Sequence, residues 1–302
     1  MQNTDIELIL SELFGKKFIK GFPISYYTSF KCGGMAKYLV FPESLDEVIK
    51  VFEIIKKFNL NYLILGKGTN ILLSDKGFDG IVISTLKMKK FKIEDERIEC
   101  ECGIKISELL KICIENSLSG LEFLSGIPGT IGGAVKNNAG LKKEWISEKI
   151  VSVEYYDIKN EKIVKKKKEE IFFDYRKSGF GKEDFIFKTE FFLKKEKRDI
   201  IKKMIKEYLK ERKERQPIGY SAGSIFKNPY PYYAGQLIEN CGLKGYSIGG
   251  CFVSTKHANF IINRGNCRAK DVYELIRIIK EKVKEKFNIE LETEIEIIGD
   301  FE

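Results

Sequence analysis

Hydrophobic residues recur with two different periods along this chain, so we expect helices and strands to be intermixed. From Leu45 to Ile55 apolar residues return every three or four positions, as on the buried face of a helix, and Ser44 with Glu47 has the spacing of a capping box. Residues 91–102 instead alternate between apolar and polar positions, which predicts a strand hairpin. Strands and helices do not alternate regularly, so we predict an α+β fold rather than a doubly wound α/β fold.

The same patterns divide the chain and place the remaining elements. We expect one lobe over residues 1–85, a second over 86–196, a third over 197–290, and a returning C-terminal strand within 291–302. Further strands are predicted near 37–41, 61–65, 71–73, 80–84, 150–157, 162–166, 184–193, 250–254, 259–263 and 289–298, and further helices near 106–117, 198–214, 233–241 and 270–287.

Composition excludes several classes of protein. With 302 residues, 43% of them hydrophobic, the chain is expected to be a globular enzyme with a sizeable core. It has no run of about 20 apolar residues and no secretory signal, so we expect a cytoplasmic protein without a membrane segment. The net charge of +9 is interleaved with acidic residues, which favours phosphorylated small ligands over nucleic acid.

The cysteines and the single histidine indicate which redox and metal sites to expect. The seven cysteines form no Cys-x-x-Cys pair, so reduced thiols in a cytosolic core are expected. The only histidine is His257, and we therefore expect no metal site.

Two glycine-rich loops are the most informative feature of the sequence. One is GKGTN at residues 66–70, which follows an apolar strand, and the other is PGTIGGAVKNNAG at residues 128–140. Glycines permit positive φ angles and a close approach of backbone N–H groups to a pyrophosphate. The first loop has Ile71 where a Rossmann loop needs glycine, and Gly68 follows Lys67 where a Walker loop needs serine or threonine. We therefore predict a large dinucleotide, FAD, held by a different fold.

These loops resemble the two phosphate loops of the UDP-N-acetylenolpyruvoylglucosamine reductase (MurB) family. LGKGTNILLSDKGF at residues 65–78 is similar to the first, and GIPGTIGGAVKNNAG at residues 126–140 to the second. The short stretch between Arg176 and Ser224 resembles the subgroup without an extra tyrosine loop over the substrate (type II). Five further segments match family motifs in order along nearly the whole chain: FKCGG (30–34), YRKS (175–178), AGSIFKNP (222–229), KHANF (256–260) and LETEIEIIG (291–299).

The resemblance implies a flavoprotein of the vanillyl-alcohol-oxidase type, with two FAD-binding lobes followed by a substrate-binding lobe. It also implies that NADPH reduces the flavin, which then reduces UDP-N-acetylglucosamine enolpyruvate to UDP-N-acetylmuramate for peptidoglycan synthesis. Because no histidine precedes His257, a histidyl–flavin bond in the FAD lobes is excluded. A cysteinyl bond is the alternative, and non-covalent FAD is expected. The expected partners are small molecules alone, with a monomer that needs no protein partner.

Three residues match the family's reacting groups. Hydride addition leaves negative charge next to the substrate carboxylate, and this charge must be stabilised before the carbon is protonated. The YRKS match implies that Arg176 stabilises it, because a guanidinium can hold a carboxylate with two hydrogen bonds. The match to AGSIFKNP implies that Ser224 donates the proton. Alternation alone predicts a solvated acidic face near the C-terminus, and only the family-like spacing selects Glu294 as a hydrogen-bonding carboxyl.

The resemblance also implies contacts with both ligands. Candidate substrate contacts are Tyr175, Arg215, Lys227, Asn228 and His257, although a solvated lysine and a structural histidine are the alternatives. Candidate FAD contacts are Gly66, Lys67, Gly68, Thr69 and Asn70 in the first loop, and Gly126, Ile127, Pro128, Gly129, Thr130, Gly132, Gly133, Asn138 and Gly140 in the second.

Two other functions fit parts of the pattern. Another oxidase or dehydrogenase of the same fold would have its flavin reduced rapidly by a sugar in the absence of NADPH. A basic protein that binds nucleic acid would be colourless and would bind DNA with a steep dependence on salt. The combined matches at Arg176, Ser224 and Glu294 favour the reductase.

Overall fold

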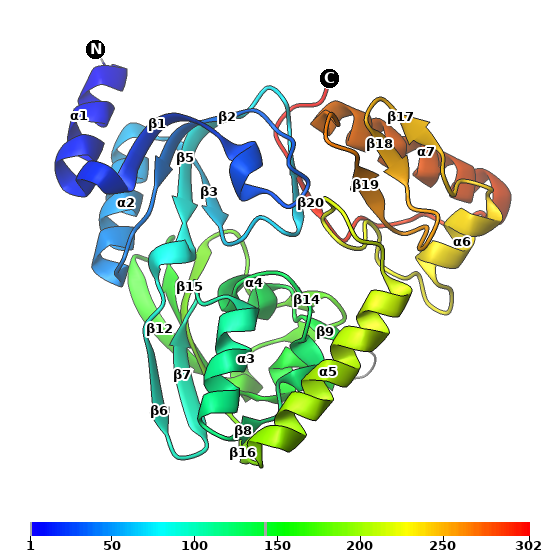
Figure 1. Cartoon of the computed structure of the whole chain (residues 1–302). Helices are drawn as coiled ribbons and strands as arrows, with labels where there is room; N and C mark the ends of the chain where they lie inside the picture. Colours follow the sequence, from blue (N-terminus) through cyan, green and yellow to red (C-terminus); the bar gives the residue numbers. More distant parts are fainter. Residues whose placement is uncertain (1, 142–143) are drawn as a thin grey trace. The chain divides into compact units, whose positions relative to one another are not determined.

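The computed structural model describes residues 2–141 and 144–302, which form two compact units that each combine three segments of the chain (Figure 1). The GKGTN loop lies where the chain passes from the first unit to the second. The four-part division expected from the sequence stays a prediction. The first unit contains Met1–Phe18, Val40–Lys67 and Ile83–Arg212, and the second contains Ile19–Leu39, Gly68–Val82 and Lys213–Glu302.

The first unit is built on a five-stranded antiparallel sheet. In spatial order its strands are β12 (Lys162–Lys167), β11 (Ile150–Asp157), β15 (Asp184–Phe192), β7 (Arg97–Glu101) and β6 (Phe91–Glu94). The other helices and strands of this unit are α1 (Gln2–Phe14), α2 (Leu45–Phe58), β3 (Asn61–Leu65), α3 (Ile106–Glu115), β8 (Leu118–Ser119), α4 (Ile131–Lys136), β9 (Gly140–Leu141), β10 (Glu144–Trp145), β13 (Phe173–Asp174), β14 (Lys177–Ser178), β16 (Lys194–Lys195) and α5 (Arg198–Arg215), of which α5 extends three residues into the second unit.

Aromatic packing joins this sheet to α2 and β3. Phe52 on the apolar face of α2 contacts Tyr156 of β11 and Phe185 of β15, with ring centroids 6.0 and 6.1 Å apart. The ring of Tyr62 in β3 meets Phe52 edge-on at 5.3 Å. Such aromatic contacts stabilise a core beyond the area they bury. They fix the position of β3, and therefore the point at which the first glycine loop begins.

The second unit combines short strands with two helices. Strands β1, β2 and β5 lie side by side in that order, and the antiparallel strands β17, β18 and β19 pack against α7 (Figure 1). Strand β20 pairs in parallel with β4, with Glu296 opposite Ile71. The elements are β1 (Phe18–Pro23), β2 (Met35–Val40), β4 (Ile71–Leu73), β5 (Phe78–Ser84), α6 (Ala234–Asn240), β17 (Ser247–Ile248), β18 (Cys251–Val253), β19 (Ile261–Asn263), α7 (Ala269–Phe287) and β20 (Glu296–Ile298), of which β1, β2 and β5 extend one or two residues into the first unit.

The predicted α+β class is confirmed by this mixture of helices and antiparallel strands. Helix α2 begins where the sequence predicts, because the Glu47 N–H donates to Ser44 Oγ at 3.3 Å. The predicted strand over 289–298 is wrong, since only Glu296–Ile298 is a strand. The residues before it form a single antiparallel bridge, between Thr293 and Phe226, instead of a continuous strand. In this bridge the Lys227 N–H donates to the Glu292 carbonyl at 2.9 Å and the Glu294 N–H donates to the Ile225 carbonyl at 2.8 Å.

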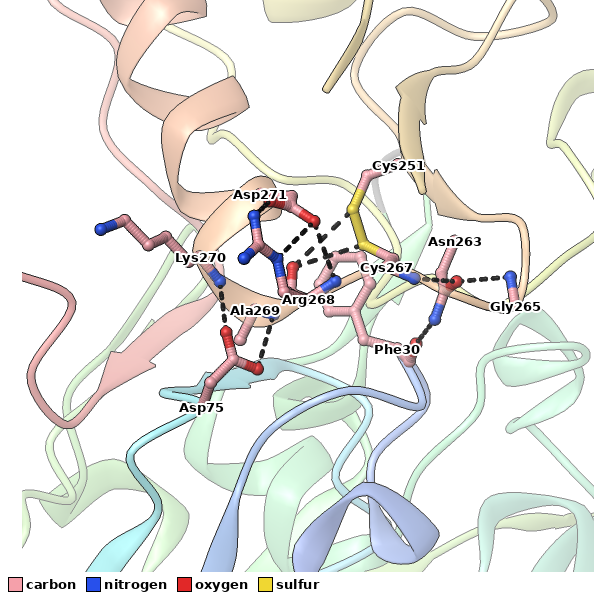
Figure 2. Close-up of a disulfide and its surroundings, with 10 residues drawn as sticks. All are labelled: Phe30, Asp75, Cys251, Asn263, Gly265, Cys267, Arg268, Ala269, Lys270 and Asp271. Atoms are coloured by element: carbon pink, nitrogen blue, oxygen red, sulfur yellow. Dashed lines mark hydrogen bonds and ion pairs between the residues drawn. A yellow bond between two sulfur atoms is a disulfide. The ribbon is translucent and has the colours of Figure 1, made fainter. Parts of the chain in front are cut away.

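The expectation that all seven cysteines are reduced is also wrong. Cys251 and Cys267 form a disulfide with their Cα atoms 5.1 Å apart (Figure 2), whereas the other five cysteines are free thiols. The disulfide joins the first residue of β18 to the loop that precedes α7. Next to it, the Asp75 carboxylate accepts hydrogen bonds from the N–H groups of Ala269 and Lys270, both at 2.9 Å, and so caps α7. The pairing was missed because it depends on tertiary contacts rather than on a spacing motif.

Reduction of the disulfide is expected to destabilise the protein. The two cysteines are 16 residues apart, and closing such a loop stabilises a fold by about 3 kcal/mol in the chain-entropy model. We expect Cys267→Ser, or treatment with dithiothreitol, to lower the free energy of unfolding in urea by about 2–3 kcal/mol. Cys241→Ser, which removes a half-buried free thiol, is the control. Equal unfolding midpoints for Cys267→Ser and the unmodified protein would contradict this expectation.

Candidate functional site

The first glycine loop packs tightly against other parts of the chain at both of its glycines. A Cβ atom at Gly66 would lie 2.5 Å from Thr130 Oγ1, so Gly66 faces the second loop. Gly68 has a φ of +60°, and a Cβ atom there would lie 2.0 Å from the Tyr27 carbonyl oxygen. The Ser29 N–H donates to the Gly68 carbonyl at 2.9 Å. Neither position can accommodate a side chain, because the loop packs closely against Thr130 and Tyr27.

The second glycine loop leads into the short helix α4, which the sequence analysis missed because three of the residues around it are glycines. Gly126 and Gly129 have φ angles of +75° and +146°, which favour glycine. Thr130 is buried and precedes α4, whereas Gly132 lies within the helix, where a Cβ atom would be 2.8 Å from the Cys102 Cβ. Close packing therefore explains part of this glycine pattern without any ligand.

Buried hydroxyl groups next to both loops provide a test for FAD. Ser29 Oγ, close to Gly68, and Ser125 Oγ, next to Gly126, have no hydrogen-bond partner within the described part of the chain. A buried polar group without a partner costs about 1–3 kcal/mol. A hydrogen-bonding ligand at either loop would remove this cost at that loop, and FAD carries such groups in its pyrophosphate and its ring carbonyls. The residues at both loops therefore fit FAD.

A short hairpin of β13 and β14 presents Arg176 next to the end of the second loop. Arg176 occupies the turn with a φ of +53°, a left-handed conformation that non-glycine residues adopt only when their surroundings hold it. Its Nη1 donates to the Gly140 carbonyl at 3.1 Å. The guanidinium lies 5.6 Å from the ring centroids of both Trp145 and Tyr175. These contacts fix the direction of the Arg176 side chain within the first unit.

Two further hydrogen bonds attach this hairpin to the second loop. Asn138 Nδ2 donates to the Asp174 carbonyl at 2.9 Å, and Ser178 Oγ donates to the Lys136 carbonyl at 2.7 Å. Both donors come from motifs that the sequence analysis identified separately. The YRKS hairpin and the second glycine loop therefore form one structural element.

In the second unit, Ser224 and Glu294 lie on neighbouring extended segments. Ser224 forms an antiparallel bridge with Phe260, and the Ile225 carbonyl accepts a hydrogen bond from the Glu294 N–H at 2.8 Å. Asn70 of the first glycine loop joins this network, because its Nδ2 donates to the Glu294 carbonyl at 3.1 Å. The second unit thus brings together an expected FAD contact and two of the expected reacting groups.

A hollow of about 300 Å³ lies next to Ser224. Two expected substrate contacts, Asn228 and His257, also line it. Because the Asn259 N–H donates to His257 Nδ1 at 3.2 Å, the proton of the neutral ring is on Nε2, and burial lowers the pKa of His257. Of the other lining residues, Lys256, Ala258 and Asn259 belong to the KHANF motif, although the sequence analysis gave them no role in a site. The remaining ones come together only through folding and were missed: Tyr233, Gly235, Gln236 and Glu239.

The other expected substrate contacts lie elsewhere. Lys227 forms an ion pair with the exposed carboxylate of Glu292. Arg215 is the exposed last residue of α5, and Tyr175 belongs to the hairpin of the first unit. Within residues 2–141 and 144–302, no group of three or more His, Cys, Asp or Glu side chains could hold a metal ion. No helix in the same ranges is long and apolar enough to span a membrane.

Comparisons with known proteins agree with the motifs. Residues 36–166 match the model of an FAD binding domain, and residues 215–298 match the model of the C-terminal domain of UDP-N-acetylenolpyruvoylglucosamine reductase. The chain is 45% identical to the reductase of that name from Caldicellulosiruptor saccharolyticus, over 95% of this chain and 93% of that protein. It is 42% identical to the one from Clostridium novyi, over 99% and 98% of the two chains. The crystal structure of MurB from Thermus caldophilus superposes with a TM-score of 0.79 at 32% identity, covering 93% of this chain and 98% of that one.

Gly66→Ala is expected to weaken FAD binding. The added Cβ atom would lie 2.5 Å from Thr130 Oγ1, so the two loops would have to separate. We expect the dissociation constant of FAD, measured by fluorescence titration of the apoprotein, to rise about tenfold or more, which corresponds to a loss of at least about 1.4 kcal/mol. Gly181→Ala is the control, because its Cβ atom would meet only Asp184 Oδ2 at 3.7 Å. Equal FAD affinity in the two variants would show that this close contact is unimportant.

Proposed function

The chain belongs to the UDP-N-acetylenolpyruvoylglucosamine reductase family, and we propose that it reduces UDP-N-acetylglucosamine enolpyruvate to UDP-N-acetylmuramate with NADPH, a reaction of peptidoglycan synthesis. FAD, held by residues of the two glycine loops, would supply the hydride chemistry that connects NADPH to the enolpyruvyl group. The observation that carries the proposal is the hydrogen-bond network that joins the Ser224 and Glu294 segments to Asn70 of the first glycine loop. This network keeps Ser224, Glu294 and Asn70 of the first glycine loop in the same part of the second unit.

We assign the proton transfer to the Ser224 hydroxyl. A serine hydroxyl is a weak acid, so it donates a proton only to a strongly basic carbon in a site that excludes water. Ser224 is half-buried, and its backbone is fixed on one side by the bridge to Phe260. The neighbouring Glu294 carboxyl would hydrogen-bond the charge that develops on the substrate carboxylate, provided that it is protonated.

We assign the stabilisation of the substrate carboxylate to Arg176. Its guanidinium presents hydrogen-bond donors in a planar fork that matches a carboxylate. The Gly140 carbonyl and the rings of Trp145 and Tyr175 restrict the side chain, so little conformational entropy is lost when the substrate binds.

The hollow next to Ser224 is the proposed site for a distant part of the sugar nucleotide. Asn228 and Lys256 supply polar groups at its wall, and neutral His257 supplies a donor at Nε2. Asn228 Oδ1 accepts a hydrogen bond from the Ala234 N–H at 3.0 Å, which orients the amide. Lys227 and Arg215 are proposed to contact the diphosphate from outside the hollow.

We further propose a cytoplasmic monomer that acts on small molecules alone. Both substrates of the proposed reaction are soluble nucleotides. Size-exclusion chromatography coupled to light scattering is expected to give the mass of one chain, 34.8 kDa before FAD is counted. Twice that mass at micromolar concentration would contradict the proposed monomer.

Ser224→Ala is expected to stop the reaction halfway. Under anaerobic conditions NADPH should bleach the yellow flavin of both the wild type and the variant, because this step needs no serine proton. Addition of UDP-N-acetylglucosamine enolpyruvate should restore the colour in the wild type and do so about 10²–10⁴-fold more slowly in the variant.

Stopped-flow absorbance of the flavin separates the two half-reactions. Equal rates of recolouring would refute the role of Ser224 while leaving the overall function intact. A wild type that is bleached by NADPH but not recoloured by the sugar nucleotide would instead refute the proposed function.

Arg176→Lys is expected to remove most of the activity although it keeps the positive charge. A lysine cannot form the two-point contact with a carboxylate, nor can it bond Gly140 in the same geometry. We expect kcat/KM for the sugar nucleotide to fall by about 10²-fold or more, with the rate of flavin bleaching by NADPH unchanged. Lys177→Arg, at the next position of the hairpin, is the control. Near-normal turnover of Arg176→Lys would exclude the role.

A further inference from the structure

The indole ring of Trp145, the only tryptophan of the chain, contacts both Gly140 and Arg176. Trp145 pairs with Gly140 across the short strands β9 and β10, and a Cβ atom at Gly140 would lie 2.5 Å from Trp145 Cε3. Arg176 donates a hydrogen bond to the Gly140 carbonyl, and its Cζ lies over the indole ring, 5.6 Å from the ring centroid. The ring therefore lies against Arg176 and against the residue to which Arg176 is hydrogen-bonded.

Two neighbouring contacts fix the position of this ring. The Tyr175 ring meets it edge-on, with the centroids 5.8 Å apart and the ring planes at 83°. The next residue, Ile146, donates from its N–H to the Ala139 carbonyl at 2.9 Å, which attaches the end of β10 to the second glycine loop. The sequence analysis did not identify Trp145, because the matched motif of that loop ends at Gly140.

A side chain of α5 secures the strand that carries Trp145. Tyr208 Oη donates a hydrogen bond to Glu144 Oε2 at 2.6 Å, and Glu144 is the other residue of β10. Burial raises the pKa of Tyr208, and the Glu144 carboxylate raises it further, so the phenol keeps its proton at neutral pH and remains a donor. Hydrogen bonds to a carboxylate are stronger than those between neutral groups. Helix α5 therefore holds β10 at the position next to Trp145.

An aromatic ring can support an arginine without occupying its hydrogen-bond donors. The face of an indole ring is electron-rich and attracts a cation that lies within about 6 Å of the ring centroid. A guanidinium can stack on such a face while the N–H groups at its edge bind a planar carboxylate. Because Arg176 is half-buried, attraction to the ring replaces part of the hydration that its charge has lost. Trp145 and a substrate carboxylate can therefore contact Arg176 at the same time.

We propose that Trp145 is a positioning residue, which holds the Arg176 guanidinium through the electron-rich face of its indole ring, and that Tyr208 keeps Trp145 in place through Glu144. The role of the ring is electrostatic as well as steric, so a ring of the same shape with less electron density on its face would be a poorer support. This inference rests on the proposed function, since Arg176 acts there on the substrate carboxylate.

Fluorinated tryptophans test the electrostatic role with little change of shape. Because Trp145 is the only tryptophan, an analogue supplied during expression replaces this residue alone. Each added fluorine withdraws electrons from the ring face. From tryptophan through mono- and difluorotryptophan to trifluorotryptophan, kcat/KM for UDP-N-acetylglucosamine enolpyruvate should fall stepwise, by about 2- to 30-fold in total, which is the range expected for one cation–π contact. The rate of flavin bleaching by NADPH should stay the same.

A double-mutant cycle tests whether Trp145 acts through Arg176. Trp145→Leu should slow the recolouring of the reduced flavin by the sugar nucleotide about tenfold in the otherwise unmodified protein. In an Arg176→Gln background, which has no charge for the ring to support, it should slow recolouring no further. A general structural role would slow both backgrounds equally. Phe192→Leu is the matched control, because it removes an exposed ring that lies 5.8 Å from another arginine, Arg97, and it should change neither half-reaction.

Tyr208→Phe tests the link to α5, because it removes only the hydroxyl that bonds Glu144. It should lower kcat/KM for the sugar nucleotide about threefold or more and leave flavin bleaching by NADPH unchanged. Combined with Trp145→Leu, it should cause no further loss. Wild-type kcat/KM in Tyr208→Phe would overturn the part assigned to this tyrosine.

The fluorine series decides the role of Trp145, and it does so even if Trp145→Leu fails to fold. The same kcat/KM with all four forms of tryptophan would overturn the inference while leaving the proposed function intact. Equal slowing by Trp145→Leu with and without Arg176 would also overturn it. A wild type that is bleached by NADPH but not recoloured by the sugar nucleotide would overturn both the inference and the proposed function.

Discussion

The last extended segment of the chain determines where the candidate chemistry of the second unit lies. Through backbone and amide hydrogen bonds, Glu294 is joined to Ile225 on one side and to Asn70 on the other. Strand β20 continues this arrangement by pairing with β4, the strand that follows the first glycine loop. Hydrogen bonds fix both distance and direction. The relative positions of Ser224, Glu294 and the loop therefore depend on the main chain more than on contacts between their side chains.

In the first unit, side chains that take no part in the proposed chemistry hold Arg176 in place. Asn138, an expected FAD contact, donates to the Asp174 carbonyl and accepts from the Ser147 N–H, so its amide joins three segments of protein. Ser178 of the YRKS motif similarly donates to the loop at Lys136. These residues keep Arg176 in its left-handed turn. A motif residue that the sequence suggests as a ligand contact, such as Asn138, can therefore serve to position another residue, here Arg176.

Features that depend on neighbouring residues in the sequence could be predicted, whereas features that depend on distant residues could not. Helix α2 and the hairpin of β6 and β7 depend on the periodicity of adjacent residues, and both were located correctly. The strand expected over 289–298 was too long, because alternation shows which residues can be extended but not which partner pairs with them. The disulfide and the hollow next to Ser224 both depend on contacts between distant segments. No spacing rule identifies such features.

The parallel pairing of β20 with β4 also limits when the protein can become active during its synthesis. Asn70 and its partner Glu294 are 224 residues apart, so the first glycine loop is made long before the segment that completes its surroundings. Phe301, next to the C-terminus, stacks on Tyr273 and lies buried in the same core. Contacts between such distant residues form late in folding. Until β20 has been synthesised, β4 has no partner strand on the edge where β20 pairs with it. A chain whose synthesis stopped before residue 294 would therefore lack the carboxyl on which the proposed chemistry depends.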